Sequence, residues 1–196
     1  MKKQLSPQER TAHVFPILFN VGMMLVLLIG SGAFPNNVRA RSVIIVTTIS
    51  NNYSPDGHCS LGEAITNANN NVPTYGDCIA GTGNDTIVFA SSLGTDTIML
   101  SSTLPTITDS AGLTIDGDNR ITLNGNDTVR VLYVTSGLIL QNISVTHGKS
   151  TTGGGLINDG GIVTITHSVF SNNSATAGVG GGLLNIGTVT ITHSTF

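Results

Sequence analysis

GGGLINDGGIVTITHSVF, residues 153–170, is followed by a near copy, GGGLLNIGTVTITHSTF, at residues 180–196. An earlier phrase, ISVTH at residues 143–147, ends in the same way, so that His147, His167 and His193 are spaced by 20 and 26 residues. Self-similarity at a period of roughly 20–50 residues is the signature of a solenoid. One coil of a parallel β-helix uses about this number of residues for its short strands and turns.

Short strand-like segments follow one another after Gly83. In each of them Thr or another polar residue separates apolar residues, and turn signals such as Asp-Gly and Asn-Gly lie between the segments. An antiparallel sandwich would show such strands without a fixed period, so the repeat favours the solenoid. The predicted strands are Asp85–Phe89, Asp96–Leu100, Leu113–Ile115, Ile121–Leu123, Val129–Val134, Leu138–Leu140, Ile143–Val145, Val163–Ile165 and Val189–Ile191.

The sequence therefore predicts an all-β fold, a right-handed, single-stranded parallel β-helix over residues 83–196. Neighbouring coils are expected to stack about 4.8 Å apart. Their glycine triplets allow turns with positive φ or close backbone approach. The expected columns have Val163 and Ile165 over Val189 and Ile191 inside the tube, and Thr164 over Thr190 outside. Because the sequence stops at Phe196 in the middle of a coil, we expect a fragment or a truncated product of a longer repeat protein.

One helix is expected before the first coil. Ser60 can cap its start, and Glu63, three residues on, can complete a capping box. An apolar face forms at the spacing i, i+3, i+4 and i+7, made of Leu61, Ala64, Ile65 and Ala68. We expect residues 41–82 to form an N-terminal cap in which this helix plugs the open end of the first coil, because that end would otherwise expose core and unpaired backbone.

The first forty residues have the features of a signal peptide. Lys2, Lys3 and Arg10 precede an apolar stretch, residues 21–29, and then Val38-Arg-Ala40 matches a signal-peptidase site. We expect cleavage after Ala40, with Ala33 as a second candidate. An uncleaved membrane anchor is the alternative, but Pro16 and Asn20 interrupt the apolar region and a spanning helix needs about 20 apolar residues.

Export would place the two cysteines in an oxidising compartment. In an oxidising compartment an isolated pair most simply forms one disulfide, here Cys59–Cys78. A metal site is disfavoured because no CxxC motif or Cys/His cluster accompanies the pair, and only His58 is close in sequence.

The stretch Asp56–Asn69, DGHCSLGEAITNAN, resembles the CSLREA-type motif of exported bacterial proteins with right-handed parallel β-helix repeats, which are pectate-lyase-like or similar to those of polymorphic outer-membrane proteins. The resemblance continues to Phe196. Gly62 stands where that family usually has Arg, and His replaces the Asn usual in each coil. The resemblance implies this fold and a secreted or surface location, and it implies no reaction, since relatives range from adhesin-like proteins to polysaccharide-degrading enzymes.

One group of charged residues has the ingredients for polysaccharide cleavage. Asp116, Asp118 and Arg120 are close in sequence, with Asp127 and Arg130 expected about a coil later. A lyase needs acidic residues that hold Ca²⁺ and an arginine for the proton, and a hydrolase needs two facing carboxyl groups. Because Asp-Gly and Asn-Gly sequences are also the usual turn formers, a structural role is favoured.

The three histidines suggest two alternatives. Stacked in register, His147, His167 and His193 would lie about 5 Å apart, and neighbouring rings could share a Zn²⁺. A ladder of like polar residues is also a purely structural device of solenoids. The ladder is favoured, because no carboxylate in the phrase orients the rings, so neither a metal nor another cofactor is predicted.

The composition narrows the functional classes. A net charge of −3 and only 8 Lys+Arg, half of them before Arg41, leave no basic patch for nucleic acid. The favoured function is that of an exported protein, secreted or at the cell surface or outer membrane, which adheres to extracellular polysaccharides or cell-surface glycans. The alternatives are a polysaccharide lyase or hydrolase with a groove along the β-helix, and a rigid spacer of a longer surface protein. The membrane would be contacted only through the signal segment or a C-terminal anchor outside this sequence.

Overall fold

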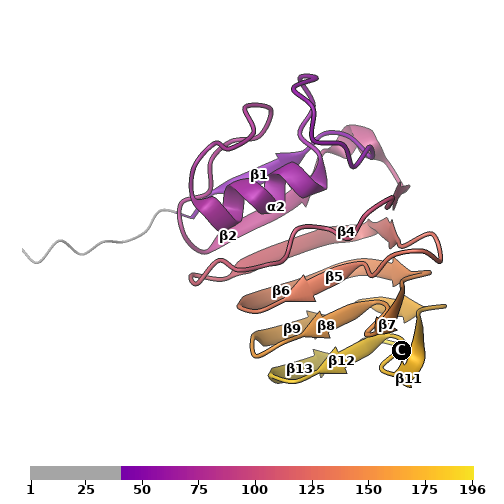
Figure 1. Ribbon diagram of the computed structural model, residues 1–196. Helices are drawn as coiled ribbons and strands as arrows, with labels where there is room; N and C mark the ends of the chain where they lie inside the picture. The colour runs from indigo at the N-terminus through magenta and orange to yellow at the C-terminus, as the bar shows by residue number, and fades with distance from the viewer. Residues whose placement is uncertain (1–40) are drawn as a thin grey trace, which may run out of the picture. The chain divides into compact units, whose positions relative to one another are not determined.

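The computed structural model describes residues 41–196, which fold as a right-handed parallel β-helix of about four turns (Figure 1). The predicted fold class is thus confirmed. The predicted signal segment, with the candidate cleavage sites after Ala33 and Ala40, lies outside the described residues.

Each coil contributes strands to three rows of parallel pairing. Row 1 stacks β1, β2, β4, β6, β9 and β13. β4 and β6 continue around a corner into row 2, where they pair with β3 and β10, and row 3 contains β5, β8 and β12. β7 and β11 pair with each other between rows 2 and 3. The bounds are β1 Val43–Val46, β2 Asp85–Phe89, β3 Asp96–Met99, β4 Leu113–Asn124, β5 Leu132–Val134, β6 Gly137–Thr146, β7 Lys149–Thr152, β8 Leu156–Asn158, β9 Ile162–Thr166, β10 Val169–Ser171, β11 Ser174–Val179, β12 Leu183–Asn185 and β13 Thr188–Thr192, with a 3-10 helix, η2, at Ser91–Leu93.

Aliphatic columns fill the interior of the tube. Ile87, Ile115, Leu140 and Ile165 are register neighbours in row 1 and are all completely buried. Burial of each such side chain contributes about 1.5–3 kcal/mol, so the column is a main source of stability. The predicted stacking of β9 and β13 is confirmed by their register, Val163 to Val189, Thr164 to Thr190 and Ile165 to Ile191.

Some strands differ from the sequence prediction. The segments 113–115 and 121–123 belong to one strand, β4, whose register shifts between Asp116 and Ile121. The predicted strand at 129–134 begins only at Leu132. Row 3 was not predicted beyond β5, because its three-residue strands are too short to show an alternating pattern.

The helix α2 (Leu61–Asn70) begins with the expected capping box. Ser60 Oγ accepts a hydrogen bond from Glu63 N at 3.3 Å, and Ser60 N donates to Glu63 Oε2 at 2.9 Å. The helix ends at Asn70, and the C-cap residue Asn71 has a left-handed backbone with φ 54°. All four residues of the predicted apolar face are fully buried in the same core as the columns.

The helix contacts the first strands of the tube. It packs against β1 and β2, and Figure 1 shows it beside them at the N-terminal end of the solenoid. Asn69 binds the row 3 side of the first coil, donating from Nδ2 to Thr106 O at 2.7 Å and accepting from Thr108 N at 2.9 Å. These contacts support the expected plug, and the closing role itself stays a prediction.

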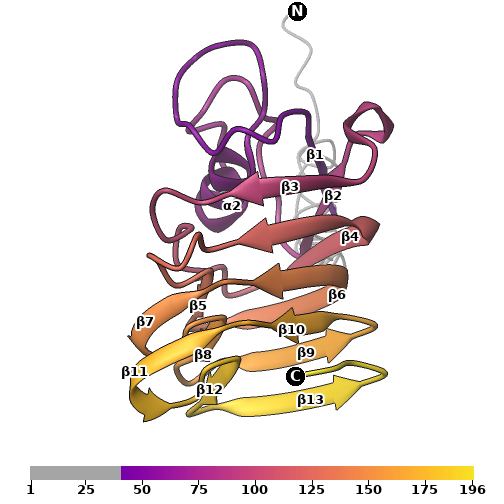
Figure 2. The ribbon, with the colours of Figure 1, turned by 90° about the vertical axis from the view of Figure 1, so that its right-hand side faces the viewer.

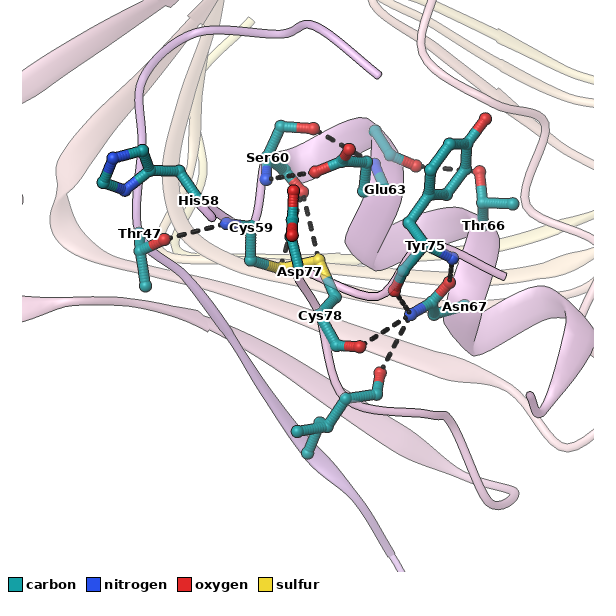
Figure 3. Close-up of a disulfide and its surroundings, with 12 residues drawn as sticks. Thr47, His58, Cys59, Ser60, Glu63, Thr66, Asn67, Tyr75, Asp77 and Cys78 are labelled. Carbon is teal, nitrogen blue, oxygen red and sulfur yellow. Dashed lines mark hydrogen bonds between the residues drawn. A yellow bond between two sulfur atoms is a disulfide. The ribbon is translucent and has the colours of Figure 1, made fainter. Parts of the chain in front are cut away.

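The predicted disulfide is confirmed. The bond joins Cys59, just before α2, to Cys78 in the loop after α2, and both side chains are buried (Figure 3). The buried amide of Asn67 holds the same exit loop by donating to the carbonyls of Tyr75 and Cys78 at 2.9 and 3.0 Å. The helix start and the following loop therefore form one cross-linked unit.

Gly62→Arg, which introduces the residue usual in the resembled family, is expected to displace the Tyr53 ring and to destabilise this protein by up to about 2 kcal/mol, since the better helix propensity of Arg offsets part of the loss. A Cβ at Gly62 would overlap the ring and hydroxyl of Tyr53, which is 36% exposed and can move only by giving up its packing. Thermal melting of the variant measures the effect. The matched control is the double variant with Tyr53→Ala, in which the space is free and most of the loss due to Gly62→Arg should vanish; an equal loss with and without Tyr53 would show that the ring is not the cause.

Candidate functional site

The three weak catalytic candidates meet at the corner where β4 passes from row 1 to row 2. Arg120 Nε lies 2.9 Å from Asp118 Oδ2, and Arg120 Nη1 donates to the Gly94 carbonyl at 2.6 Å. Asp118 and Asn119 have positive φ, 51° and 54°. The arginine thus ties the corner to the preceding coil, which supports a structural role for the cluster.

Asp116 is the best anchored carboxylate of this corner. It accepts hydrogen bonds from Asp118 N at 3.0 Å, Gln141 Nε2 at 2.8 Å and Asn142 Nδ2 at 3.0 Å. Partial burial raises the pKa of Asp116, but the hydrogen bonds from Asn142, Asp118 and Gln141 outweigh it and hold the pKa below its usual range. A carboxyl group with a depressed pKa is ionised at neutral pH and is poorly suited to be a general acid.

Asp116→Asn is expected to weaken the dependence of stability on acid. Because the folded-state pKa of Asp116 is lowered, its contribution is fully present above the unfolded pKa of about 4 and is lost as the pH falls through the folded pKa. Urea unfolding between pH 7 and pH 2 should show a shallower acid loss in the variant than in the wild type. Identical acid limbs would mean that the three hydrogen bonds do not favour the ionised form.

Asp127 and Arg130 do not join this corner. Arg130 donates to the backbone carbonyls of Gly153 and Thr152 at 3.0 and 2.9 Å and to the Ser150 hydroxyl, so it supports the loop around β7. Its guanidinium carbon lies 5.5 Å from the centre of the Tyr133 ring. The charged residues predicted to gather in one cluster are thus separated by the structure.

Tyr133 forms a contact that the sequence did not indicate. Its hydroxyl donates to Asp159 Oδ2 at 2.6 Å, across one coil. This hydrogen bond is the largest cause that raises the pKa of Tyr133, so the phenol remains protonated and is unsuited to be a base. Only the coil register, which was not known from the sequence, could have paired residues 133 and 159.

The predicted ladder of three histidines is wrong for His147. His167 and His193 stack with ring centres 4.9 Å apart and an interplanar angle of 5°, but both follow row 1 strands, whereas His147 follows the row 2 part of β6. From β2 onward, register partners in neighbouring coils are 22 to 28 residues apart, so the spacing of 20 residues joins different corners. All three histidines have positive φ, between 47° and 51°.

The stacked pair has the wrong geometry for a shared Zn²⁺. In nearly parallel rings the nitrogen lone pairs point in parallel directions and do not converge on one ion. Within residues 41–196, no three His, Cys, Asp or Glu side chains are grouped closely enough to hold a metal. Asn142 occupies the corner one coil before His167, with φ 55°, so His and Asn exchange at a position where asparagine's tolerance of the left-handed conformation is useful.

The outer surface of row 2 forms a continuous uncharged face, here called the hydroxyl face. Figure 2 shows the strands of row 2, among them β3 and β10, turned toward the viewer. The outward side chains of the hydroxyl face lie in two register lines that cross successive coils. Hydroxyl and amide groups dominate both lines, and none of the side chains carries a charge. The first line is Thr97, Thr122, Ser144, Val169 and Thr195, and the second is Met99, Asn124, Thr146 and Ser171. Thr146 is the buried member of the second line, and its hydroxyl is hydrogen-bonded to His147 and Ser171.

Two hollows border the hydroxyl face. The larger, of about 450 Å³, lies between the loop 48–52 and β3 and is here called the cap groove. The smaller, of about 220 Å³, is lined by Ser144 and Val169 together with the corner residues Asn142 and His167. The larger volume is in the range of about 300–1,000 Å³ that is usual for small-molecule sites.

In the part of the chain that the structure describes, no helix is both long and apolar enough to cross a membrane. Comparison of the chain with protein-family models, with curated proteins and with solved structures finds no match.

Proposed function

We propose that this protein is an exported, surface-located β-helix protein of the CSLREA-like type, and that its hydroxyl face binds neutral glycans in adhesion. The observation that carries the proposal is the register of row 2, which aligns Thr, Ser and Asn side chains across successive coils without a charged residue among them. The smaller hollow beside Ser144 adds a recess to this face.

The chemistry of the hydroxyl face matches that of a neutral sugar polymer. Sugar hydroxyls both donate and accept hydrogen bonds, as Ser and Thr hydroxyls and Asn amides do. A polyuronate would need cationic partners for its carboxylates. The arginines Arg120 and Arg130 donate to backbone carbonyls, and the exposed Lys149 lies on β7, outside the register lines of the hydroxyl face. The face therefore favours uncharged glycans over acidic ones.

Two features support export. The disulfide Cys59–Cys78 is the kind of cross-link that persists in oxidising compartments. The first forty residues have the charged, apolar and small-residue regions of a signal peptide. Fusion of residues 1–40 to a reporter that is active only after export tests this part of the proposal; a reporter that stays inside the cell and inactive would contradict it.

A glycan array tests the binding proposal. The chain should bind neutral polysaccharides in preference to polyuronates and sulfated glycans. Ser144→Glu, which places a charge on the hydroxyl face, should weaken binding by at least about tenfold, equal to 1.4 kcal/mol.

Thr190→Glu is the matched control, because it also replaces a hydroxyl side chain by a carboxylate. Thr190 is exposed on the outer surface of row 1, away from the hydroxyl face. It should leave binding within about twofold of the wild type. Binding of acidic glycans alone, or a loss caused by Thr190→Glu and not by Ser144→Glu, would overturn the assignment of the hydroxyl face.

A further inference from the structure

The cap groove combines polar and apolar walls in a way that suits one sugar ring. One wall is the loop 48–52. The other is the outer surface of β3 together with Ser101, two residues after the strand ends. Two apolar side chains, Ile49 and Met99, are 41% and 50% exposed, one on each wall. The remaining lining is uncharged and polar: Thr48, Ser50, Asn51, Asn52, Thr97 and Ser101.

The loop wall is held in place by the start of α2. Ser60 Oγ donates to the Asn52 carbonyl at 2.7 Å, and Gly62 N donates to Asn51 Oδ1 at 3.2 Å. Just before the groove, Cys59 N donates to Thr47 Oγ1 at 2.9 Å. The disulfide-linked helix start therefore positions the groove, which is a property expected of a preorganised site.

The two groove asparagines hold the loop wall, and hydroxyl groups are the polar groups that the groove exposes. Asn51 accepts at Oδ1 from Gly62 N, and its side chain also hydrogen-bonds Tyr53. Asn52 donates from Nδ2 to Asp56 Oδ2 at 3.0 Å. The groove lining that a ligand can reach includes the exposed hydroxyl residues Ser50, Thr97 and Ser101.

We infer that the cap groove binds a single neutral pyranose unit, the end or a branch of a glycan. A sugar hydroxyl is both donor and acceptor, so it can pair with the exposed hydroxyls of Ser50, Thr97 and Ser101. The apolar C–H surface of the ring packs on Met99 and Ile49, in keeping with small-molecule sites that combine apolar lining and a few polar groups. This inference rests on the proposed function, since it assigns the groove as a sugar subsite next to the hydroxyl face.

The test measures binding of small soluble probes to the full chain. The probes are the methyl glycosides of glucose, galactose, mannose and N-acetylglucosamine, with methyl glucuronoside and methyl galacturonoside as charged counterparts. Titration followed by NMR should show saturable binding of at least one neutral probe and no saturable binding of the uronosides. Met99→Lys and Ile49→Lys, which alter opposite walls at exposed positions, should each weaken binding by at least about tenfold.

Ile139→Lys is the matched control, because Ile139 is also an exposed apolar residue, at 40%, but lies on the outer surface of row 1 and lines neither the groove nor the hydroxyl face. It should change the affinity for the methyl glycoside by less than about twofold, and thermal melting should show all three variants folded. Neutral-probe binding that survives both groove variants overturns the inference, as does array binding by the chain without binding of any methyl glycoside. In both cases the hydroxyl face would stand, whereas absence of both kinds of binding would overturn the proposed function as well.

Discussion

Replacement of Leu140 by aspartate is expected to abolish folding of the β-helix. Leu140 is completely buried, and its register neighbours Ile115 and Ile165 are equally buried and apolar, so that the carboxylate would have no partner from them. An uncompensated buried charge costs about 3–5 kcal/mol, in addition to the lost apolar packing. A domain of this size has a net stability of about 5–15 kcal/mol. The cooperative thermal transition and the strand signal in circular dichroism should therefore be lost.

The neighbouring residue provides the control for this prediction. Ile139 lies on the same strand, is 40% exposed and pairs in register with Thr114 and Thr164 on the outward side. Ile139→Asp should change the free energy of unfolding by less than about 1 kcal/mol. If Leu140→Asp melts like Ile139→Asp, the inward assignment of the column is wrong.

Removal of the disulfide is expected to lower the free energy of unfolding by about 3 kcal/mol. Cys59 and Cys78 are separated by 19 residues, and closing a loop of this length removes chain entropy from the unfolded state worth about that amount. The variant Cys59→Ser with Cys78→Ser should unfold at a lower denaturant concentration than the oxidised wild type. Its cap should also become more susceptible to proteolysis, because α2 and the loop after it lose their covalent link.

Reduction supplies the control for the disulfide prediction. Dithiothreitol should lower the unfolding midpoint of the wild type to near that of the double serine variant and leave the variant itself unchanged. Equal midpoints for the oxidised wild type and the variant would contradict the stabilising role of the cross-link.

Most strands of rows 1 and 2 could be predicted from the sequence because they are long enough to show alternation, whereas β1 and the three-residue β10 were not predicted. The phrases around Val163 and Val189 repeat the same inward and outward pattern, and the structure stacks them as predicted. The row 3 strands Leu156–Asn158 and Leu183–Asn185 have three residues each, and their neighbours in the tube, rather than a local pattern, make them strands.

The histidines show why the register could not be completed from the sequence. Each coil has two corners that accept a residue with positive φ, and His147 and His167 occupy different ones. Because the histidine motif occurs at both corners, the sequence alone does not show which corner a given copy occupies. The hydroxyl face and the Tyr133–Asp159 contact depend on the same register and therefore became visible only in three dimensions.

The structure also changes which residues form the candidate site. The residues with catalytic ingredients, Asp116, Asp118 and Arg120, form hydrogen bonds that hold the first corner together. The uncharged side chains of row 2 had seemed to be ordinary strand residues. Alignment across coils is what turns them into a surface with one consistent chemistry.

NMR mapping of a bound neutral hexasaccharide tests the central claim most directly. Backbone amide shifts are followed as the hexasaccharide from the strongest neutral array signal is titrated into the isotope-labelled chain. If the hydroxyl face binds the hexasaccharide, the largest shifts lie on row 2, around Thr122, Ser144 and Ser171, with little change on β9 and β13. Shifts concentrated on the outer surface of row 1 or around Arg120, or no shifts at saturating sugar, would contradict it.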